Sequence, residues 1–236
     1  MTELLTFDLD DTLWDAGPVL ARAEALLYAW LAAEAPQLTA RYSMEDLVNY
    51  RRQFAKNRPE LRHDFTLLRI HALAELLPQA GHSAELAEPA VAAFLAARSE
   101  VEMYEDAVHA LGSLRPDFRL VAITNGNTDL DRAGLAHYFE FCVSPALAKT
   151  AKPDPRMFEI VAERTGVAPG ATIHIGDEPY YDVEAAHRAN VSAIWVNRAG
   201  REWPQDLRPA EAEIASFTEL RAAIATIENL KRSQQP

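Results

Sequence analysis

The chain has 236 residues, of which 49% are hydrophobic and 25% charged, a composition that is ordinary for a soluble globular protein of one large or two smaller domains. The formal net charge of -12 argues against nonspecific binding to nucleic acid or anionic membranes, because polyanions would be repelled. No apolar run approaches the ~20 residues of a membrane span, and the single cysteine, Cys142, excludes an intrachain disulfide and fits a reducing compartment. We therefore expect a cytoplasmic protein.

The first predicted element is a β-strand over residues 4–9, an apolar run that ends in acidic residues. From there to residue 104, β-like runs are absent and apolar residues recur at helical spacing. Helices are expected near residues 19–31, 44–55, 65–77 and 84–97. This helical stretch predicts an inserted α-helical cap domain at residues 15–104.

Beyond residue 104, short β-rich runs alternate with helical patterns, and this alternation predicts a parallel sheet covered by helices. The expected strands are residues 119–124, 141–143, 172–175 and 191–196, and the expected helices are 107–114, 129–136, 155–165, 180–189 and 217–227. The predicted fold class is therefore α/β, with a Rossmann-like parallel sheet core formed by residues 1–14 and 105–236 and the helical cap inserted between them.

Polar residues stand where several predicted strands end. Asp8 and Asp10 end the first strand, Thr124 ends the second, Asp177 ends a later one, and Lys152 lies in a loop before a helix. Each could be explained alone as a helix cap, a turn or a solvated charge. In open parallel sheets, however, ligands bind beyond the carboxyl ends of the strands. The convergence predicts one site, and its clustered carboxylates suit a hydrated hard cation or a reacting phosphate.

These residues resemble the four sequence motifs of the haloacid dehalogenase superfamily, in its phosphatase branch. The motifs stand here as Asp8-Leu9-Asp10-Asp11-Thr12, Thr124-Asn125-Gly126, Lys152-Pro153, and Gly176-Asp177-Glu178 with Asp182. Their order matches along nearly the whole chain, and the inserted helices resemble the cap of one subfamily. Among members, the chain looks most like the bacterial FMN and 5-amino-6-(5-phospho-D-ribitylamino)uracil phosphatases.

The resemblance implies a magnesium-dependent phosphomonoester hydrolase. Asp8 would attack phosphorus and form an aspartyl-phosphate, while Asp10 would protonate the leaving group and then deprotonate water. Lys152 and Thr124 would contact the phosphate as it is transferred. The family assigns Mg²⁺ to Asp8, the backbone carbonyl of Asp10 and Asp177, a set of hard oxygen ligands that suits this ion.

Other motif residues are expected in supporting roles. The backbone amides of Asn125 and Gly126 would bind the phosphate, and Asp182 would orient Lys152 or metal-bound water. Thr12 would position Asp10, although it could equally cap the next turn. Trp14 is a candidate for stacking on a substrate ring, with core packing as the equal alternative.

The predicted cap carries a basic cluster that could receive a phosphate-bearing metabolite. Its members are Arg51, Arg52, Lys56, Arg58, Arg62, His63 and Arg69. A solvated helical face that balances nearby acids is the favoured interpretation. For Tyr50 and Phe54, which could stack on a ring, core packing is favoured.

Two alternatives to the phosphatase stay open. A 2-haloacid dehalogenase would use the first aspartate but would need neither magnesium nor an acid for an alkoxide, so Asp10 and Asp177 argue against it. A non-enzymatic phosphometabolite-binding module is less favoured, because every residue needed for turnover is present. We expect a small phosphorylated metabolite as partner, with FMN or the ribitylaminouracil phosphate as leading candidates, no nucleic acid or membrane partner, and a monomer or homodimer.

Overall fold

The chain forms two compact units in a computed structural model that describes residues 1–61 and 63–233. Unit 1 comprises Met1–Asp15, Glu102–Gly126 and the chain from Gly134 onward, and unit 2 comprises Ala16–Val101 and Asn127–Ala133. Residues 15–104 were predicted to form a cap, a domain that covers the site of another domain. That role of unit 2 stays a prediction. Arg62, from the predicted basic cluster, lies outside the described residues.

Unit 1 is built on a parallel sheet of six strands in the order β3-β2-β1-β4-β5-β6. The strands are β1 (Leu4–Phe7), β2 (Arg119–Ile123), β3 (Cys142–Val143), β4 (Thr172–Gly176), β5 (Ser192–Val196) and β6 (Ala212–Ile214). The central strand β1 pairs with β2 on one side and with β4 on the other. The strand order reverses at β1, which is where doubly wound sheets bind ligands at their carboxyl edge. The predicted α/β class with a parallel sheet is confirmed.

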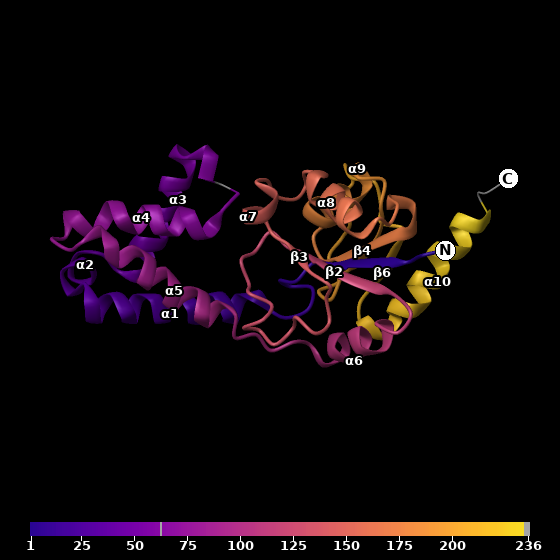
Figure 1. Cartoon of the computed structure of the whole chain (residues 1–236), viewed down its shortest axis with the longest axis horizontal. Coiled ribbons are helices and arrows are strands. Elements are labelled where there is room, and N and C mark those ends of the chain that lie inside the picture. The colour runs from indigo at the N-terminus through magenta and orange to yellow at the C-terminus, as the bar shows by residue number, and fades with distance from the viewer. Residues whose placement is uncertain (62, 234–236) are drawn as a thin grey trace. The chain divides into compact units, whose positions relative to one another are not determined.

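Helices cover both faces of this sheet. They are α6 (Glu105–Leu114), α7 (Pro145–Ala148), α8 (Arg156–Thr165), α9 (Ala185–Arg188) and α10 (Leu220–Ser233), with a π-helical turn at Pro179–Glu184. In Figure 1, α8 and α9 lie above the sheet, α6 lies below it, and α10 runs along its right-hand end. This double cover explains why the strands are apolar runs without strict alternation, since both faces are buried.

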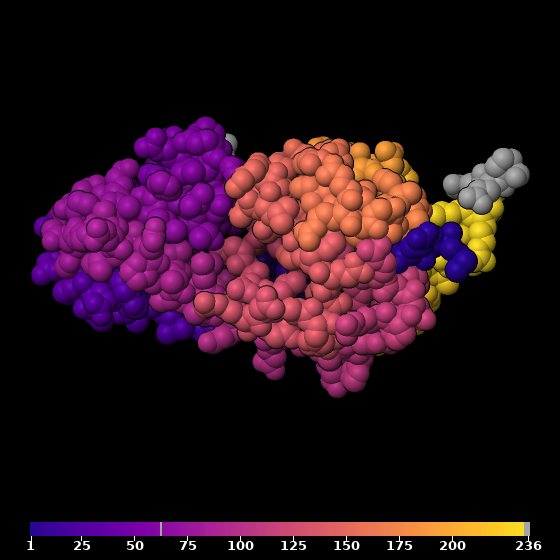
Figure 2. Space-filling model, in the orientation of Figure 1, coloured from indigo at the N-terminus to yellow at the C-terminus, as the bar shows by residue number. Residues whose placement is uncertain are grey.

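In the longer segment of unit 2, the described residues form helices joined by short turns. Its helices are α1 (Ala16–Glu34), α2 (Pro36–Arg41), α3 (Met44–Asn57), α4 (Phe65–Gln79) and α5 (Ala87–Arg98). Ser43 and Asp46 form a capping box at the start of α3, and the Asp64 carboxylate accepts from two backbone N–H groups at the start of α4. Figure 2 shows α1 in indigo along the lower edge of this unit, with α3 to α5 in violet above it.

One predicted element is wrong, and the short elements α2, α7 and β6 were not predicted. The helix expected at residues 129–136 is wrong, because this segment forms turns. The Asp129 carboxylate accepts from the backbone N–H groups of Asp131 and Arg132, and Gly134 has a φ of 70°, which ends any helix. Strand β6 was not anticipated, since it has three residues with a glutamate in the middle. Among the described residues, no helix combines the length and the apolar character that crossing a membrane requires.

Candidate active site

The loop after β1 carries two of the predicted acids. Asp8 follows the strand directly, and its backbone N–H donates to the Ile175 carbonyl at 2.9 Å, so the sheet fixes the main chain there. The loop then turns, and the indole Nε1 of Trp14 donates to Asp10 Oδ1 at 2.9 Å. Asp8 is buried and Asp10 half-buried. The sheet thus positions the first carboxylate, and a tryptophan four residues after Asp10 orients the second.

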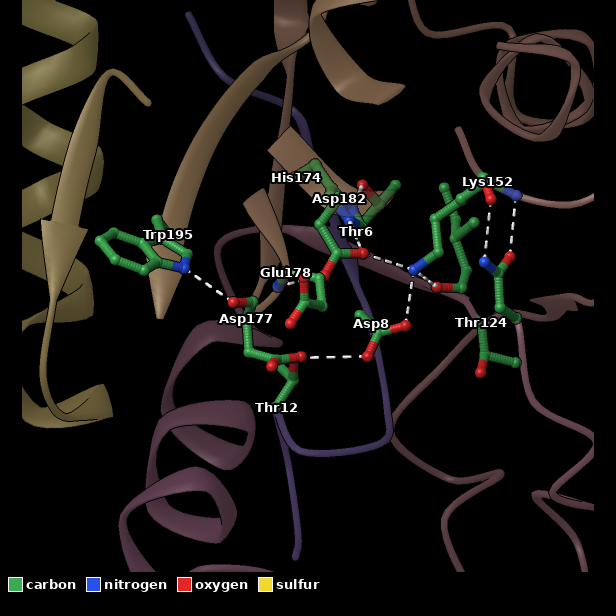
Figure 3. Close-up of polar contacts among 12 residues, drawn as sticks. Thr6, Asp8, Thr12, Thr124, Lys152, His174, Asp177, Glu178, Asp182 and Trp195 are labelled. Atoms are coloured by element: carbon green, nitrogen blue, oxygen red, sulfur yellow. Dashed lines mark hydrogen bonds and ion pairs between the residues drawn. The ribbon is translucent and has the colours of Figure 1, made fainter. Parts of the chain in front are cut away.

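The buried ammonium of Lys152 connects two carboxylates. Its Nζ lies 2.5 Å from Oδ1 of Asp8 and 2.5 Å from Oδ1 of Asp182, and it donates to the Ile123 carbonyl at 2.9 Å (Figure 3). Three acceptors match the three hydrogens of an ammonium group. Burial alone would lower the pKa of Lys152, but Asp182 and Asp8 outweigh burial and hold the pKa above its usual value. The lysine is therefore a fixed cation.

The second motif holds the lysine by its backbone. The Asn125 side chain donates to the Lys152 carbonyl at 3.0 Å and accepts from the Lys152 N–H at 2.8 Å. Thr124, at the end of β2, is buried, and its Oγ1 accepts from the Gly126 N–H at 2.8 Å. Asn125 therefore acts on the position of Lys152 through its side chain, a role that the motif alone did not predict.

Thr12 joins two of the predicted metal ligands. Its hydroxyl lies 3.4 Å from Asp8 Oδ2 and 3.3 Å from Asp177 Oδ1, and it is buried. A hydroxyl has one hydrogen, so it donates to one carboxylate at a time. The expected contact was with Asp10, so the structure assigns Thr12 to a different pair of acids.

The loop after β4 is held from outside the hollow. The indole Nε1 of Trp195 donates to the Asp177 carbonyl at 2.7 Å (Figure 3), and Arg201 Nη1 donates to Glu178 Oε1 at 2.7 Å. Arg201 Nη2 also lies 3.4 Å from Asp177 Oδ2. These contacts fix the main chain that presents the Asp177 carboxylate.

Asp182 lies against the end of β4. Its Oδ2 accepts from the Glu178 N–H at 2.8 Å, and its Oδ1 accepts from Lys152. A Cβ at Gly176 would lie 2.3 Å from the Asp182 Cγ, so only glycine leaves room for this carboxylate. The glycine of the fourth motif is therefore explained by close approach of a side chain.

The electrostatics divide these acids into two kinds. Burial would raise the pKa of Asp182, but Lys152 and a hydrogen bond from His174 outweigh it and hold the pKa below its usual range. Burial raises the pKa of Asp8 well above its usual value, and Lys152 offsets this only in part. Burial and then Asp182 raise the pKa of Asp177 to about 7. The described protein groups thus stabilise one anion fully and leave two short of positive charge.

The site residues line one hollow of about 150 Å³ within unit 1. Its lining consists of Asp8, Asp10, Asp11, Thr124, Asn125, Gly126, Lys152, Asp177, Glu178, Tyr181 and Asp182. Six of these residues are acidic and one is a lysine. Of the ten predicted site residues, eight line the hollow, and Thr12 and Trp14 are bonded to residues of the lining.

This donor set fits a hard divalent cation. Carboxylate oxygens of Asp8, Asp177 and Asp182 lie within 4.8 Å of one another. Both oxygens of Asp182 accept short hydrogen bonds, and its pKa is held low, whereas among the described residues Asp8 Oδ2 has only a long contact of 3.4 Å with Thr12. The pKa values of Asp8 and Asp177 are raised, and a nearby cation would lower both. The hydrogen bonding of Asp182 and the raised pKa values of Asp8 and Asp177 therefore favour Asp8 and Asp177 as ligands and Asp182 as a partner of Lys152.

Trp14 supports the site from behind the lining of the hollow. Trp14 is fully buried, and its indole is bonded to Asp10, so the expectation that it stacks on a substrate ring is not supported. Tyr181, about half exposed at the π-helical turn, is the one aromatic side chain among the described lining residues. Sequence reasoning missed it, although it lies four residues after Asp177 in the fourth motif.

The predicted basic cluster of unit 2 is largely engaged within that unit. Arg51 Nη2 and Arg69 Nη2 lie 2.6 and 2.5 Å from the same oxygen of Glu24. Tyr50 and Phe54 stack with ring centroids 6.3 Å apart, and Phe54 is buried. The pairing with Glu24 agrees with the expected balance of nearby acids, but Arg69 is buried, so a solvated face does not describe this arginine. Arg52, Lys56 and Arg58 are exposed, as a solvated face predicts.

Known proteins resemble the chain along most of its length. A family model described as haloacid dehalogenase-like hydrolase matches residues 2–190. The 5-amino-6-(5-phospho-D-ribitylamino)uracil phosphatase of Escherichia coli (strain K12) is 33% identical over 92% of this chain and 94% of its own. Phosphoserine phosphatase of Thermus thermophilus is 32% identical over 86% of this chain and 91% of its own.

One similar solved structure is named as a dehalogenase, whereas the two relatives above are named as phosphatases. The crystal structure of a 2-haloacid dehalogenase from Pseudomonas syringae pv. Tomato is 37% identical, with a TM-score of 0.89, and covers 95% of this chain and 99% of its own. The matches confirm the family, the fold and the enzyme class that the motifs predicted.

Proposed function

Since the chain belongs to the haloacid dehalogenase-like hydrolase family, we propose that it is a magnesium-dependent phosphatase of small phosphate monoesters. One observation carries this proposal: the buried Lys152 ammonium lies 2.5 Å from Asp8 Oδ1 inside a hollow lined by Asp10, Thr124 and Asp177. A nucleophile, a proton donor and a fixed cation within one hollow are what phosphoryl transfer requires.

In the first half-reaction, a carboxylate oxygen of Asp8 attacks phosphorus. The new bond joins Asp8 to the phosphoryl group, and the bond from phosphorus to the substrate's ester oxygen breaks. Asp10 gives its proton to that oxygen, so an alcohol leaves. The Trp14 indole, which donates to Asp10 Oδ1, holds the carboxylate of this general acid in one orientation.

In the second half-reaction, water attacks the phosphorus of the aspartyl-phosphate. Asp10, now ionised, takes a proton from the water, and Asp8 leaves as a carboxylate. Lys152 stays charged through both steps and stabilises the negative charge of the transferring group. Thr124 accepts from the Gly126 N–H, and its own hydroxyl hydrogen can be donated to a phosphate oxygen.

Magnesium would be held by the carboxylates of Asp8 and Asp177 and by the backbone carbonyl of Asp10. When bound, the ion offsets the repulsion between the phosphate and the acids of the hollow. The raised pKa values of Asp8 and Asp177 support this assignment, because burial makes both carboxylate anions costly and a bound cation would offset that cost. Asp182 serves the site by orienting Lys152.

We propose that unit 2 is the cap that selects the substrate. The two phosphatase relatives bear the names of different substrates, a ribitylaminouracil phosphate and phosphoserine, so the motifs alone do not define the leaving group. Tyr181 lines the hollow and is 47% exposed, which suits contact with a planar ring. FMN and the ribitylaminouracil phosphate are therefore the leading substrates. A cytoplasmic location and a monomer or homodimer stay predictions.

A 2-haloacid dehalogenase is the second candidate, favoured by the likeness to the Pseudomonas structure. Halide is a leaving group that needs no proton donor, and attack of the aspartate on carbon needs no magnesium ion. Asp10, bonded to Trp14, and Asp177, bonded to Thr12, would have no task in that reaction. The phosphatase accounts for both residues.

The test is product release from a panel of compounds, with and without Mg²⁺. The panel holds FMN, the ribitylaminouracil phosphate, phosphoserine, sugar phosphates and 2-chloropropionate, and Asp8→Asn serves as the control. Magnesium-dependent phosphate release that is lost in the variant supports the proposal. Chloride release without phosphate release replaces it with the dehalogenase, and no release at all favours a binding module.

A further inference from the structure

A chain of buried polar groups lies behind the catalytic lysine. Thr6 on β1 and His174 on β4 are register partners in the sheet, and both are 0% exposed. Thr6 Oγ1 lies 2.9 Å from His174 Nδ1, and His174 Nε2 lies 3.3 Å from Asp182 Oδ1 (Figure 3). Asp182 in turn holds Lys152. Polar groups in the middle of a buried sheet are costly unless they are bonded, so this chain calls for a reason.

The partners of the histidine fix its tautomer. An ionised carboxylate only accepts, so the Nε2 that faces Asp182 carries a hydrogen. Burial lowers the pKa of His174 despite the nearby Asp182, which keeps the ring neutral. A neutral ring has one hydrogen, so Nδ1 accepts from the Thr6 hydroxyl. Each group between β1 and the lysine thus has one direction of donation: Thr6 to His174, and His174 to Asp182.

Asp182 receives three donors along this chain and around it. Oδ1 accepts from His174 Nε2 and from Lys152 Nζ, and Oδ2 accepts from the Glu178 N–H. The backbone donor and the lysine lie on the two ends of the carboxylate, and the histidine adds the second donor at Oδ1. Loss of this donor would leave the rotation of the carboxylate, and with it the position of the ammonium, less defined.

We propose that His174 is a positioning residue that acts through Asp182 to hold Lys152 at Asp8, and that Thr6 fixes the orientation of the His174 ring. The inference rests on the proposed function, since Lys152 is the cation of that site. His174 touches neither phosphate nor metal in this account. Its effect is on the placement of a neighbour, and small displacements of a catalytic group cost large factors in rate.

Packing alone is the competing explanation. The His174 ring contacts Phe158 edge to face, with centroids 4.9 Å apart and an interplanar angle of 87°. His174→Phe keeps a ring at this place and removes the donor to Asp182, whereas His174→Gln loses the ring and keeps an N–H. The two variants therefore separate packing from hydrogen bonding.

The kinetic test uses p-nitrophenyl phosphate as the probe. His174→Phe is expected to lower kcat about 10- to 100-fold with little change in KM, and His174→Gln to recover a large part of the loss. His187→Phe is the matched control, because His187 is a histidine with a side chain only 7% exposed that pairs with a carboxylate, that of Glu211, outside the hollow lining. Equal kcat for His174→Phe and the wild type, or a greater loss in His174→Gln than in His174→Phe, overturns the proposal.

A gentler pair of variants keeps the test decisive if His174→Phe does not fold. Thr6→Val is close in shape and lacks the hydroxyl, and Thr6→Ser keeps it. We expect kcat to fall about 3-fold in Thr6→Val, consistent with the loss of one neutral hydrogen bond, and to stay near the wild-type value in Thr6→Ser. The same kcat in both variants contradicts the role of Thr6 and of the chain.

A measurement without substrate separates this inference from the proposed function. Nitrogen-15 NMR of the imidazole distinguishes a protonated from an unprotonated ring nitrogen. The expected spectrum is a neutral His174 ring with hydrogen on Nε2 and none on Nδ1. The opposite tautomer overturns the chain even if the enzyme releases phosphate. If the spectrum shows the expected tautomer but the wild type has no phosphatase activity, the hydrogen-bonded chain is correct and the proposed function is wrong. The positioning role of His174 in catalysis is then wrong as well.

Discussion

The two units each bury cations against carboxylates, but in opposite proportions. In unit 1, the ammonium group of one lysine, Lys152, is shared by the carboxylates of Asp8 and Asp182. In unit 2, the single carboxylate of Glu24 is shared by Arg51 and Arg69. The first cluster has an excess of acid and opens into a hollow lined by further acids. The second has an excess of base.

The surroundings of each cluster show what its excess charge is for. Glu24 balances only one of the two arginine charges. The guanidinium of Arg69 lies 3.5 Å from the centroid of the Phe94 ring, so a cation–π contact within the unit stabilises the remaining positive charge. In unit 1, Arg201 Nη2 lies 3.4 Å from Asp177 Oδ2, but burial and the nearby Asp182 outweigh it and raise the pKa of Asp177 to about 7. Charge that the fold satisfies serves stability, whereas charge that it leaves unsatisfied is available for a ligand.

The largest expected effect is that of removing the shared cation of unit 1. Lys152→Ala should lower the rate of phosphate release about 10²- to 10³-fold, because the transition-state charge loses its fixed counterion. The rate is measured on folded protein, checked by circular dichroism. Lys149→Ala is the control, since Lys149 is an exposed lysine in the same loop region. If both variants kept wild-type rates, Lys152 would not act in catalysis, and the acid-rich cluster of unit 1 would have no functional role.

Removing the metal should have the next largest effect. Chelation of divalent ions should abolish phosphate release, and saturating Mg²⁺ should raise the melting temperature by about 5 °C, because only the folded acids bind it. Asp177→Asn should weaken this thermal shift, while Asp206→Asn, a change at an exposed acid of unit 1, should leave it unchanged. A full thermal shift in Asp177→Asn would remove Asp177 from the metal site.

The shared carboxylate of unit 2 should matter for stability. Glu24→Gln should lower the free energy of unfolding by about 2 kcal/mol, since two arginines that are largely buried lose their common anion. Turnover of p-nitrophenyl phosphate per folded molecule should change little. Urea unfolding gives the difference, with Glu60→Gln, at an exposed acid of the same unit, as the control. An unchanged unfolding midpoint would show that this cluster is not structural.

The Glu24 pair also predicts a pH dependence. Burial would raise the pKa of Glu24, but Arg69 and Arg51 outweigh it and lower the pKa below the unfolded value of about 4.3. A lowered pKa stabilises the fold above the unfolded value, and this contribution is lost as the pH falls through the folded value. The stability gap between wild type and Glu24→Gln should therefore shrink as the pH falls below about 4.3. If the stability difference between wild type and Glu24→Gln grew as the pH fell, the pKa of Glu24 would not be lowered in the folded protein.

The smallest effect concerns the leaving group. Tyr181→Leu should raise KM about 5- to 10-fold for ring-bearing phosphates such as FMN and leave phosphoserine unaffected, because ring contact contributes about 1 kcal/mol. Tyr180→Leu is the matched control, since Tyr180 is equally exposed but outside the hollow lining. Equal KM values for FMN in the two variants would remove Tyr181 from the substrate site.

The sequence was most informative where chemistry and topology coincide. Asp8, Thr124 and Asp177 were placed correctly at strand ends because acidic and hydroxyl residues interrupt apolar runs there. Lys152 could be placed from its motif alone. The helical segments of unit 2 followed from apolar spacing, whereas the expected helix at residues 129–136 failed because a side chain of Asp129 competes for the backbone donors.

Other residues gave no local signal. Thr6 and His174 lie inside strands, and a polar residue there looks like ordinary alternation until the register pairs the two. The role of Trp14 could not be decided, since burial depends on the packing around the loop. Arg201 reaches Asp177 and Glu178 from a distant loop, and such a contact is not encoded at short range. The contacts that tune the site are therefore long-range ones.

The most direct test of the central claim is detection of phosphate on Asp8. Enzyme mixed with Mg²⁺ and the best substrate of the panel is quenched in acid within one turnover, and its peptides are weighed by mass spectrometry. The account predicts that the peptide with Asp8 gains the mass of one phosphoryl group and that Asp8→Asn gains none. Rapid phosphate release with no modified peptide, or with the phosphoryl group on another residue, would contradict it.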